Sequence, residues 1–124
     1  MAEVRRIPQW RMLEALRNAV TALHLEKSDG TSTEDYVVVG PADFDSDTTG
    51  GDPVLRLSSE TTKTLQVDAG DTIMAIVLWI DDTNAPAAYE DDEIRFPIGG
   101  VDGETFPDGG SIDVTEFEVY LNDL

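Results

Sequence analysis

Residues 72–80 read TIMAIVLWI and contain the longest apolar run of the chain. Asp71 precedes this run, and Asp81 and Asp82 follow it. A continuous apolar segment of this length predicts a central β-strand that is covered on both faces. The run is far shorter than the roughly 18–20 residues that a membrane-spanning helix needs. We therefore expect a soluble protein with no membrane partner.

Shorter segments with strand patterns lie on both sides of this run, separated by turns rich in Gly, Pro and Asp. The predicted strands are residues 36–39, 54–58, 62–67, 72–80 and 94–98. Pro97 cannot donate a hydrogen bond to a neighbouring strand, so its segment is expected at a sheet edge or a strand end. The predicted fold class is mainly β: an antiparallel β-sandwich or jelly-roll-like domain over residues 31–124.

The last predicted strand, residues 112–121, changes the parity of its apolar positions. Ile112 and Val114 lie at even positions, whereas Phe117, Val119 and Leu121 lie at odd ones. In a straight strand, these two sets face opposite sides of the sheet, and one set then meets a partner or a second layer. One extra residue would reunite them, so we predict a β-bulge near residues 115–116.

Residues 8–26 have the pattern of one amphipathic α-helix, with Pro8 suited to its first turn. Residues 1–27 therefore form the predicted N-terminal helix of a single domain, residues 1–124. The wide apolar sector of this helix allows packing over its own sheet, or partly against another subunit. Its apolar stripe, together with an aromatic residue in a later Ala- and Pro-containing loop, forms the predicted interface: Trp10, Leu13, Leu16, Val20, Leu23 and Tyr89.

The charge of the chain is strongly negative, with 26 Asp and Glu residues against 8 Lys and Arg residues and a formal net charge of −18. Only two residues are Lys. Such a composition suits molar salt, in which the Debye length shrinks to about 3 Å. We infer a halophilic source, and an acidic mesophilic protein is the alternative.

The basic residues concentrate at the beginning of the chain. Residues 1–27 carry five basic and three acidic side chains, a net +2, whereas residues 28–124 carry three basic and twenty-three acidic ones, a net −20. The first segment is expected to dock on its own body or on a neighbouring subunit; contact with a polyanion is the alternative. The acidic body repels a phosphate backbone, so we do not expect nucleic acid as a partner.

No motif in the sequence names a reaction. The chain has no Cys and one His, His24, which excludes disulfides, thiolate metal sites and a Cys nucleophile. His24 is predicted at the end of the helix, where it would interact with the helix dipole, and Trp10 and Trp79 are predicted in the core. Paired carboxylates near Asp81 and Glu90 could act as general acid and base only if one were buried, which nothing in the sequence indicates. We therefore predict no enzyme, no catalytic residue and no cofactor.

One acidic loop, residues 43–52, has carboxylates at alternating positions, a spacing that can supply the several oxygen ligands of a hard cation. Its positions are counted here from Asp43. It departs from a helix–loop–helix calcium loop, because Thr48 occupies the sixth position and Val54 the twelfth. A solvated acidic loop is the alternative to bound Mg²⁺, Ca²⁺, Na⁺ or K⁺. The candidate ligands are Asp43, Asp45, Asp47 and Asp52.

Three stretches in the second half of the chain are similar to segments of a known class of proteins. They are VDAGDTIMAIVLWIDDTN (67–84), EIRFPIGG (93–100) and VDGETFPDGGSIDVTEFEVYLND (101–123). With a Gly-Asp-x-hydrophobic turn at residues 70–73 and a final alternating strand after Gly109 and Gly110, the chain resembles small β-sandwich virion proteins of tailed viruses. The opening helix and the acidic loop lie outside that pattern.

The resemblance, combined with the halophilic composition, implies a non-enzymatic subunit of a haloarchaeal tailed-virus particle. The subunit would belong to the tail, the head–tail connector or the capsid decoration. It implies copies of the chain and other virion proteins as partners, assembly in the host cytoplasm and residence in the virion. The alternative is a β-sandwich module of a halophilic host that binds a small ligand or a carbohydrate. An enzyme that uses the carboxylates near Asp81 and Glu90 is a third hypothesis.

Overall fold

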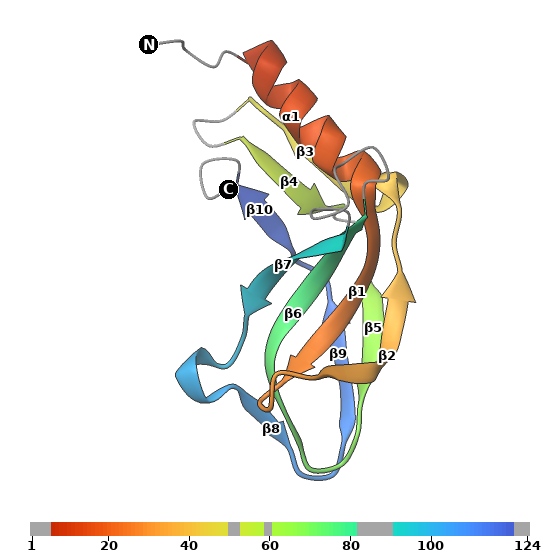
Figure 1. The fold of residues 1–124 in the computed structure, drawn as a ribbon, viewed down its shortest axis with the longest axis vertical. Coiled ribbons are helices and arrows are strands. Elements are labelled where there is room, and N and C mark those ends of the chain that lie inside the picture. Colours follow the sequence, from red (N-terminus) through yellow and green to blue (C-terminus); the bar gives the residue numbers. More distant parts are fainter. Residues whose placement is uncertain (1–5, 50–52, 59–60, 82–90, 121–124) are drawn as a thin grey trace.

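The chain folds into antiparallel sheets with one α-helix at its N-terminal end (Figure 1). The structure, a computed structural model, describes residues 6–49, 53–58, 61–81 and 91–120. Its elements are α1 (Arg6–Ala19), β1 (Val20–Lys27), β2 (Ser32–Val38), η1 (Pro41–Asp43), β3 (Phe44–Asp47), β4 (Val54–Leu57), β5 (Lys63–Val67), β6 (Asp71–Asp81), β7 (Asp91–Pro97), η3 (Gly100–Asp102), β8 (Glu104–Phe106), β9 (Gly110–Val114) and β10 (Glu118–Tyr120), where η marks a 3₁₀ turn.

The largest sheet is built around β6. Its strand order is β2-β1-β6-β7, and β8 pairs with the beginning of β6. Consecutive residues of β6 from Ala75 to Leu78 are buried, so both faces of the strand are covered. The predicted central strand is therefore confirmed. The segment with Pro97 is also confirmed as an edge, because within the described residues β7 pairs only with β6.

Two smaller sheets complete the β-sandwich-like fold: β10-β4-β3 and β5-β9. Figure 1 shows β3, β4 and β10 next to α1, beside the upper end of the largest sheet, whereas β5 and β9 lie behind β1 and β6. The core lies between the sheets and contains Phe44, Leu55, Leu65, Val114 and Phe117 together with inward-facing residues of β1 and β6. Each large apolar side chain buried there stabilises the fold by about 1.5–3 kcal/mol.

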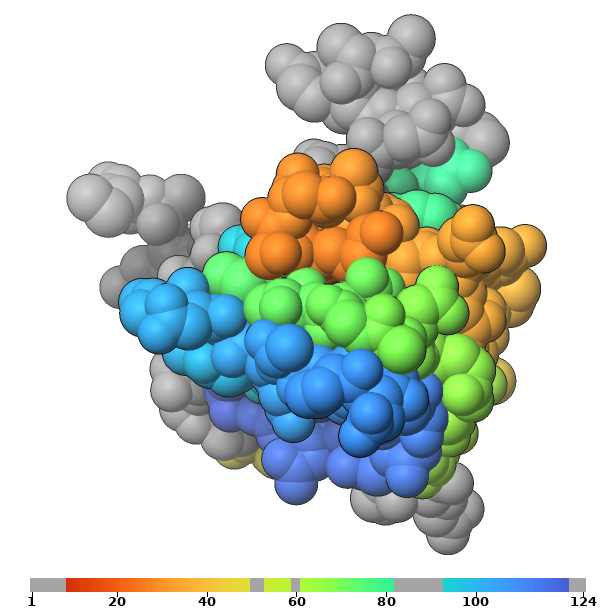
Figure 2. Space-filling model, turned by 90° about the horizontal axis from the view of Figure 1, so that it is seen from below, coloured from red at the N-terminus to blue at the C-terminus, as the bar shows by residue number. Residues whose placement is uncertain are grey.

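The end of the molecule opposite α1 is formed by three turns that pack side by side. Figure 2 views this end and shows the β1–β2 segment in orange, the β5–β6 segment in green and the β8–β9 segment in blue. Backbone hydrogen bonds link the three, from Ser28 N–H to the Thr72 carbonyl (3.0 Å) and from Gly70 N–H to the Phe106 carbonyl (2.8 Å). Gly109 has a φ of +75°, and a Cβ there would lie 2.9 Å from a backbone oxygen, so only glycine fits this turn.

The predicted N-terminal helix is wrong in its second half. The helix ends at Ala19, and β1 (Val20–Lys27) follows directly, hydrogen-bonded between β2 and β6. Val20 and Leu23 continue the helical spacing of the apolar residues before them, but the same segment is buried on both faces as a strand. Pairing with two distant strands stabilises β1 more than continuing the helix would, and β-branched side chains such as Val20 favour that outcome.

The predicted β-bulge near residues 115–116 is also wrong. The last strand instead divides into β9, which pairs with β5, and β10, which pairs with β4 in another sheet. Three residues outside any strand connect them, and Val114, Phe117 and Val119 are all buried. The parity change is real, because the chain rotates both apolar sets toward the core while it crosses between sheets.

Candidate functional site

An aromatic cluster lies on the outer face of the largest sheet, the face turned away from the core. Strand register places Tyr36 of β2 beside His24 of β1, and Val38 of β2 and Trp79 of β6 on either side of Ala22. Tyr36 is 56% exposed, Val38 69% and Trp79 37%. The Tyr36 and Trp79 rings lie 6.3 Å apart at an interplanar angle of 36°. We call these three exposed side chains the outer-face cluster. Trp79 was expected in the core, and that prediction is wrong.

His24 lies buried beneath this cluster, in the middle of β1 rather than at a helix end, so its predicted role at the helix dipole is wrong. Its ring centroid lies 4.2 Å from that of Trp79, and its Nε2 lies 3.8 Å from a carboxylate oxygen of Glu93. Neither ring nitrogen has a hydrogen-bond partner in the described part of the chain. Burial lowers the pKa of His24, and the nearby negative charge of Glu93 opposes this effect only in part.

The lowered pKa of His24 predicts a loss of stability on acidification. The unfolded chain binds a proton on this residue near pH 6.5, whereas the folded chain binds it only at lower pH. The free energy of unfolding should therefore fall as the pH drops from 7.5 through 6.5 and stop falling, for this residue, below its folded pKa. His24→Phe should remove this pH dependence. It should also raise the free energy of unfolding by about 1 kcal/mol at pH 7.5, because the variant no longer buries two ring nitrogens without hydrogen-bond partners.

The measurement is urea unfolding of both proteins at constant salt between pH 7.5 and 5. The carboxylates titrate in both proteins, so the difference between the two curves isolates His24. Parallel curves would contradict a buried, neutral His24.

An ion pair covers the remainder of this face. Arg95 of β7 donates to both carboxylate oxygens of Glu26 of β1, at 2.6 and 2.9 Å, and Glu26 raises the pKa of Arg95. The pair spans β6 above Ala75 and Val77, which are completely buried. The outer face is therefore apolar around Trp79 and polar beside it.

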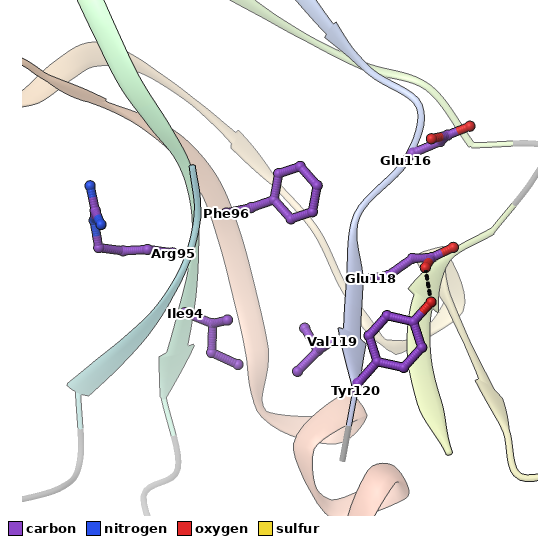
Figure 3. A pocket seen from close by; sticks show the side chains of 7 residues that line it. All are labelled: Ile94, Arg95, Phe96, Glu116, Glu118, Val119 and Tyr120. Carbon is purple, nitrogen blue, oxygen red and sulfur yellow. Dashed lines mark hydrogen bonds between the residues drawn. The ribbon is translucent and has the colours of Figure 1, made fainter. Parts of the chain in front are cut away.

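A groove opens between the edges of two sheets, beside β7 and β10 (Figure 3). Its volume is about 460 Å³. Ile94 and Phe96 of β7 point toward β10, and Val119 points back toward them, whereas Arg95 points away. We call this the lateral groove; it is lined by Ile94, Arg95, Phe96, Glu116, Glu118, Val119 and Tyr120.

Both strands beside the lateral groove are edge strands. Within the described residues, β7 pairs only with β6, and β10 pairs only with β4. The ring of Phe96 packs against that of the buried Phe117, with the ring centroids 5.5 Å apart. An apolar floor between two sheet edges can receive a side chain or an extended segment from another protein.

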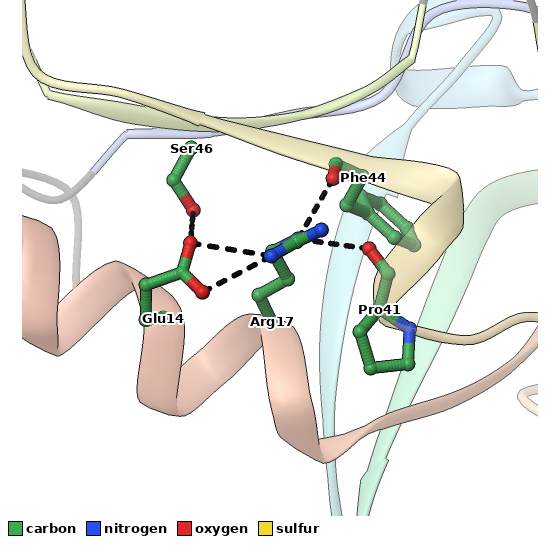
Figure 4. Close-up of polar contacts among 5 residues, drawn as sticks. All are labelled: Glu14, Arg17, Pro41, Phe44 and Ser46. Atoms are coloured by element: carbon green, nitrogen blue, oxygen red, sulfur yellow. Dashed lines mark hydrogen bonds and ion pairs between the residues drawn. The ribbon is translucent and has the colours of Figure 1, made fainter.

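Arg17 fixes α1 on the body of the domain (Figure 4). Its Nε donates to the carbonyl oxygens of Pro41 and Phe44, both at 2.8 Å. Its Nη1 pairs with Glu14 at 3.0 Å, and Glu14 accepts a hydrogen bond from the Ser46 hydroxyl at 2.8 Å. These contacts set the orientation of α1 and therefore of its exposed side chains.

The predicted interface residues divide into three groups. Leu13, Val20 and Leu23 lie in the core of their own chain. Their predicted role in an interface is therefore wrong, because buried side chains offer no surface to a partner. Leu16 packs against the core and is half-buried. Trp10 is 47% exposed, and its predicted place in the core is wrong. Tyr89 lies outside the described residues.

The candidate cation ligands do not share one loop. Asp43 ends η1, where it accepts a hydrogen bond from the Gly40 N–H and pairs with Lys63 at 3.4 Å. Asp45 and Asp47 lie on β3, where Asp47 accepts hydrogen bonds from Thr49 that lower its pKa. Asp52 lies outside the described residues, and no group of three or more metal-ligating side chains occurs among those described.

The carboxylates considered for acid–base chemistry are described only in part. Asp81 is exposed at the end of β6, whereas Asp82 and Glu90 lie outside the described residues. Among the helices that the structure describes, none is long and apolar enough to cross a membrane. No protein-family model, curated protein or solved structure matches this chain.

Proposed function

We propose that this protein is a non-enzymatic structural subunit of a haloarchaeal tailed-virus particle, joined to copies of itself and to other virion proteins at high salt. The supporting observation is the set of large apolar side chains that stay exposed on a chain of net charge −18. They lie on α1, on the outer face and in the lateral groove: Trp10, Tyr36, Val38, Trp79 and Phe96. On the outer face, the rings of Tyr36 and Trp79 lie side by side. Exposed apolar patches of this kind mark protein-binding sites.

The outer-face cluster offers a direct test of assembly. In 2 M NaCl, size-exclusion chromatography with light scattering should give the wild type a mass above the 13.5 kDa of one chain. Tyr36→Ser combined with Val38→Thr should weaken that association at least about tenfold, because buried aromatic contacts dominate interface energies.

The matched control is Val101→Ser. Val101 is 92% exposed on η3, in neither the outer-face cluster nor the lateral groove, so the change should leave the mass unaltered. A wild type that stays monomeric at every concentration would contradict assembly.

A carbohydrate-binding module of a halophilic host is the second candidate. The observation that favours it is the Tyr36–Trp79 pair on a sheet face, with Glu93 and the Glu26–Arg95 pair nearby. Aromatic rings provide apolar faces on which a sugar ring can stack, and polar neighbours can bind its hydroxyls. In this case, oligosaccharides would change the Trp fluorescence of a monomeric wild type, and Tyr36→Ser would remove the change.

A further inference from the structure

We propose that Trp10 and Arg11 of α1 dock into the lateral groove of a second copy, so that copies join head to tail. This inference rests on the proposed function, since it names one contact through which copies would assemble. It concerns different residues from the outer-face cluster. On each chain, the α1 surface with Trp10 and Arg11 is separate from the lateral groove. Helix α1 packs on β3, whereas the groove lies beside β7 and β10.

The helix side of the contact is a pair of neighbouring exposed side chains. Trp10 is about half exposed, and Arg11 next to it is also exposed. Leu13 faces the core, and Arg17 ties the later part of α1 to η1 and β3. The fold therefore holds Trp10 and Arg11 on a fixed helix, which reduces the conformational entropy lost on binding.

The groove side has the complementary chemistry. Its floor is apolar, from Ile94, Phe96 and Val119, and can accept an aromatic side chain. Its rim carries the exposed carboxylates of Glu116 and Glu118. A volume of about 460 Å³ lies within the range of pockets that hold small molecules, roughly 300–1,000 Å³.

Charge complementarity favours α1 of a second copy as the segment that binds in the lateral groove. Two copies present mainly carboxylates to one another, because residues 28–124 carry a net −20. The segment before them carries +2, so docking α1 on an acidic rim replaces repulsion by attraction. Trp and Arg are also the residue types most enriched at interface hot spots. In molar salt the Trp10 contact would supply most of the affinity, and the Arg11 contact would fix the orientation.

Such a contact joins two different surfaces, so it is heterologous and generates rings or open filaments rather than closed two-fold dimers. It predicts that Trp10→Ala raises the dissociation constant at least about tenfold, measured by light scattering in 2 M NaCl. Met12→Ala is the matched control. Met12 is equally exposed on the same helix, but it lies some 200° around the axis from Trp10 and should have little effect.

Mixing two defective variants gives the sharper test. Trp10→Ala with Arg11→Glu removes the helix side, and Glu116→Arg with Glu118→Arg removes the groove side. Both double variants also carry Tyr36→Ser and Val38→Thr, which remove the outer-face contact. Each alone should then be monomeric. Together they should form a species of twice the chain mass and stop there, because only one intact helix and one intact groove remain. Circular dichroism verifies that both variants fold.

The remaining outcomes separate this contact from the proposed function. If the wild type assembles but Trp10→Ala assembles equally well, or if the mixed variants stay monomeric, the head-to-tail contact is wrong and assembly stands. If the wild type does not assemble at all, both proposals are wrong. Loss of assembly in the outer-face variant alone would assign the interface to that face and overturn this contact.

Discussion

Replacing Phe117 by alanine is expected to lower the free energy of unfolding by about 3–5 kcal/mol. The side chain is 1% exposed, and its ring packs against Phe96. Its backbone carbonyl accepts a hydrogen bond from the Leu57 N–H at 2.9 Å, which holds the residue in place where the chain crosses between sheets. The surrounding side chains can relax only in part, so the lost ring leaves a cavity. Small domains are stable by about 5–15 kcal/mol, so the loss is a large fraction of the total.

Urea unfolding at constant molar salt measures this effect, because a charged denaturant would change the ionic strength as well. Val101→Ala is the control, and at that exposed position we expect a change within about 0.5 kcal/mol. A Phe117→Ala variant less than 1 kcal/mol below the wild type would contradict the placement of this ring between the sheets.

The central strand could be predicted because its information is local. Residues 73–80 are apolar without interruption, and carboxylates flank the segment on both sides, so the pattern alone indicates a strand covered on both faces. Pro97 marked β7 as an edge for an equally local reason, since proline lacks the N–H that a second neighbour would need. The fold class followed from several such segments between turn sequences.

The first strand could not be predicted in this way, because its partners are distant in the sequence. Val20 and Leu23 fit a helical stripe, and Leu23 and Leu25 fit an alternating strand equally well. The decision comes from β6, about fifty residues later in the chain, and from β2. Because β1 was not predicted as a strand, the sequence did not show that His24 lies on the other face of the sheet from Leu23 and Leu25. Its contact with Trp79 could not be predicted either.

The lateral groove was missed for a related reason. It requires β7 and β10 to be the edges of two different sheets, whereas the sequence indicated one continuous strand for residues 112–121. The sequence did contain one indication, the change in parity of the apolar positions before Phe117. Two structures can produce that change: a β-bulge, or a crossing from one sheet to another. Sequence alone does not choose between them, because the choice depends on where β4 and β5 lie.

Lowering the salt concentration below about 0.1 M is expected to unfold the protein. At that ionic strength the Debye length reaches about 10 Å, so carboxylates across the surface repel one another. The net charge of the chain is −18. Far-UV circular dichroism from 3 M to 0.05 M NaCl at pH 7 should show a cooperative loss of structure. An unchanged spectrum below 0.1 M would contradict the inference of a halophilic protein.

Removing carboxylates should move this transition. Asp45, Asp102 and Asp108 are exposed, so changing all three to asparagine reduces the net negative charge and leaves the core intact. The variant should stay folded at lower salt than the wild type. A matched control changes three exposed neutral residues, Thr62, Ser111 and Thr115, to alanine and should leave the transition in place.

The identity of the cation separates general screening from a specific ion site. Screening depends on ionic strength alone, so NaCl, KCl and choline chloride should stabilise the fold at similar concentrations. A site built from carboxylates would prefer small hard cations and fail with choline, which is too large for such ligands. Because Asp43 and Asp47 already contact Lys63 and Thr49, we expect screening to dominate. Stabilisation by Na⁺ or K⁺ but not by choline would instead indicate a bound ion.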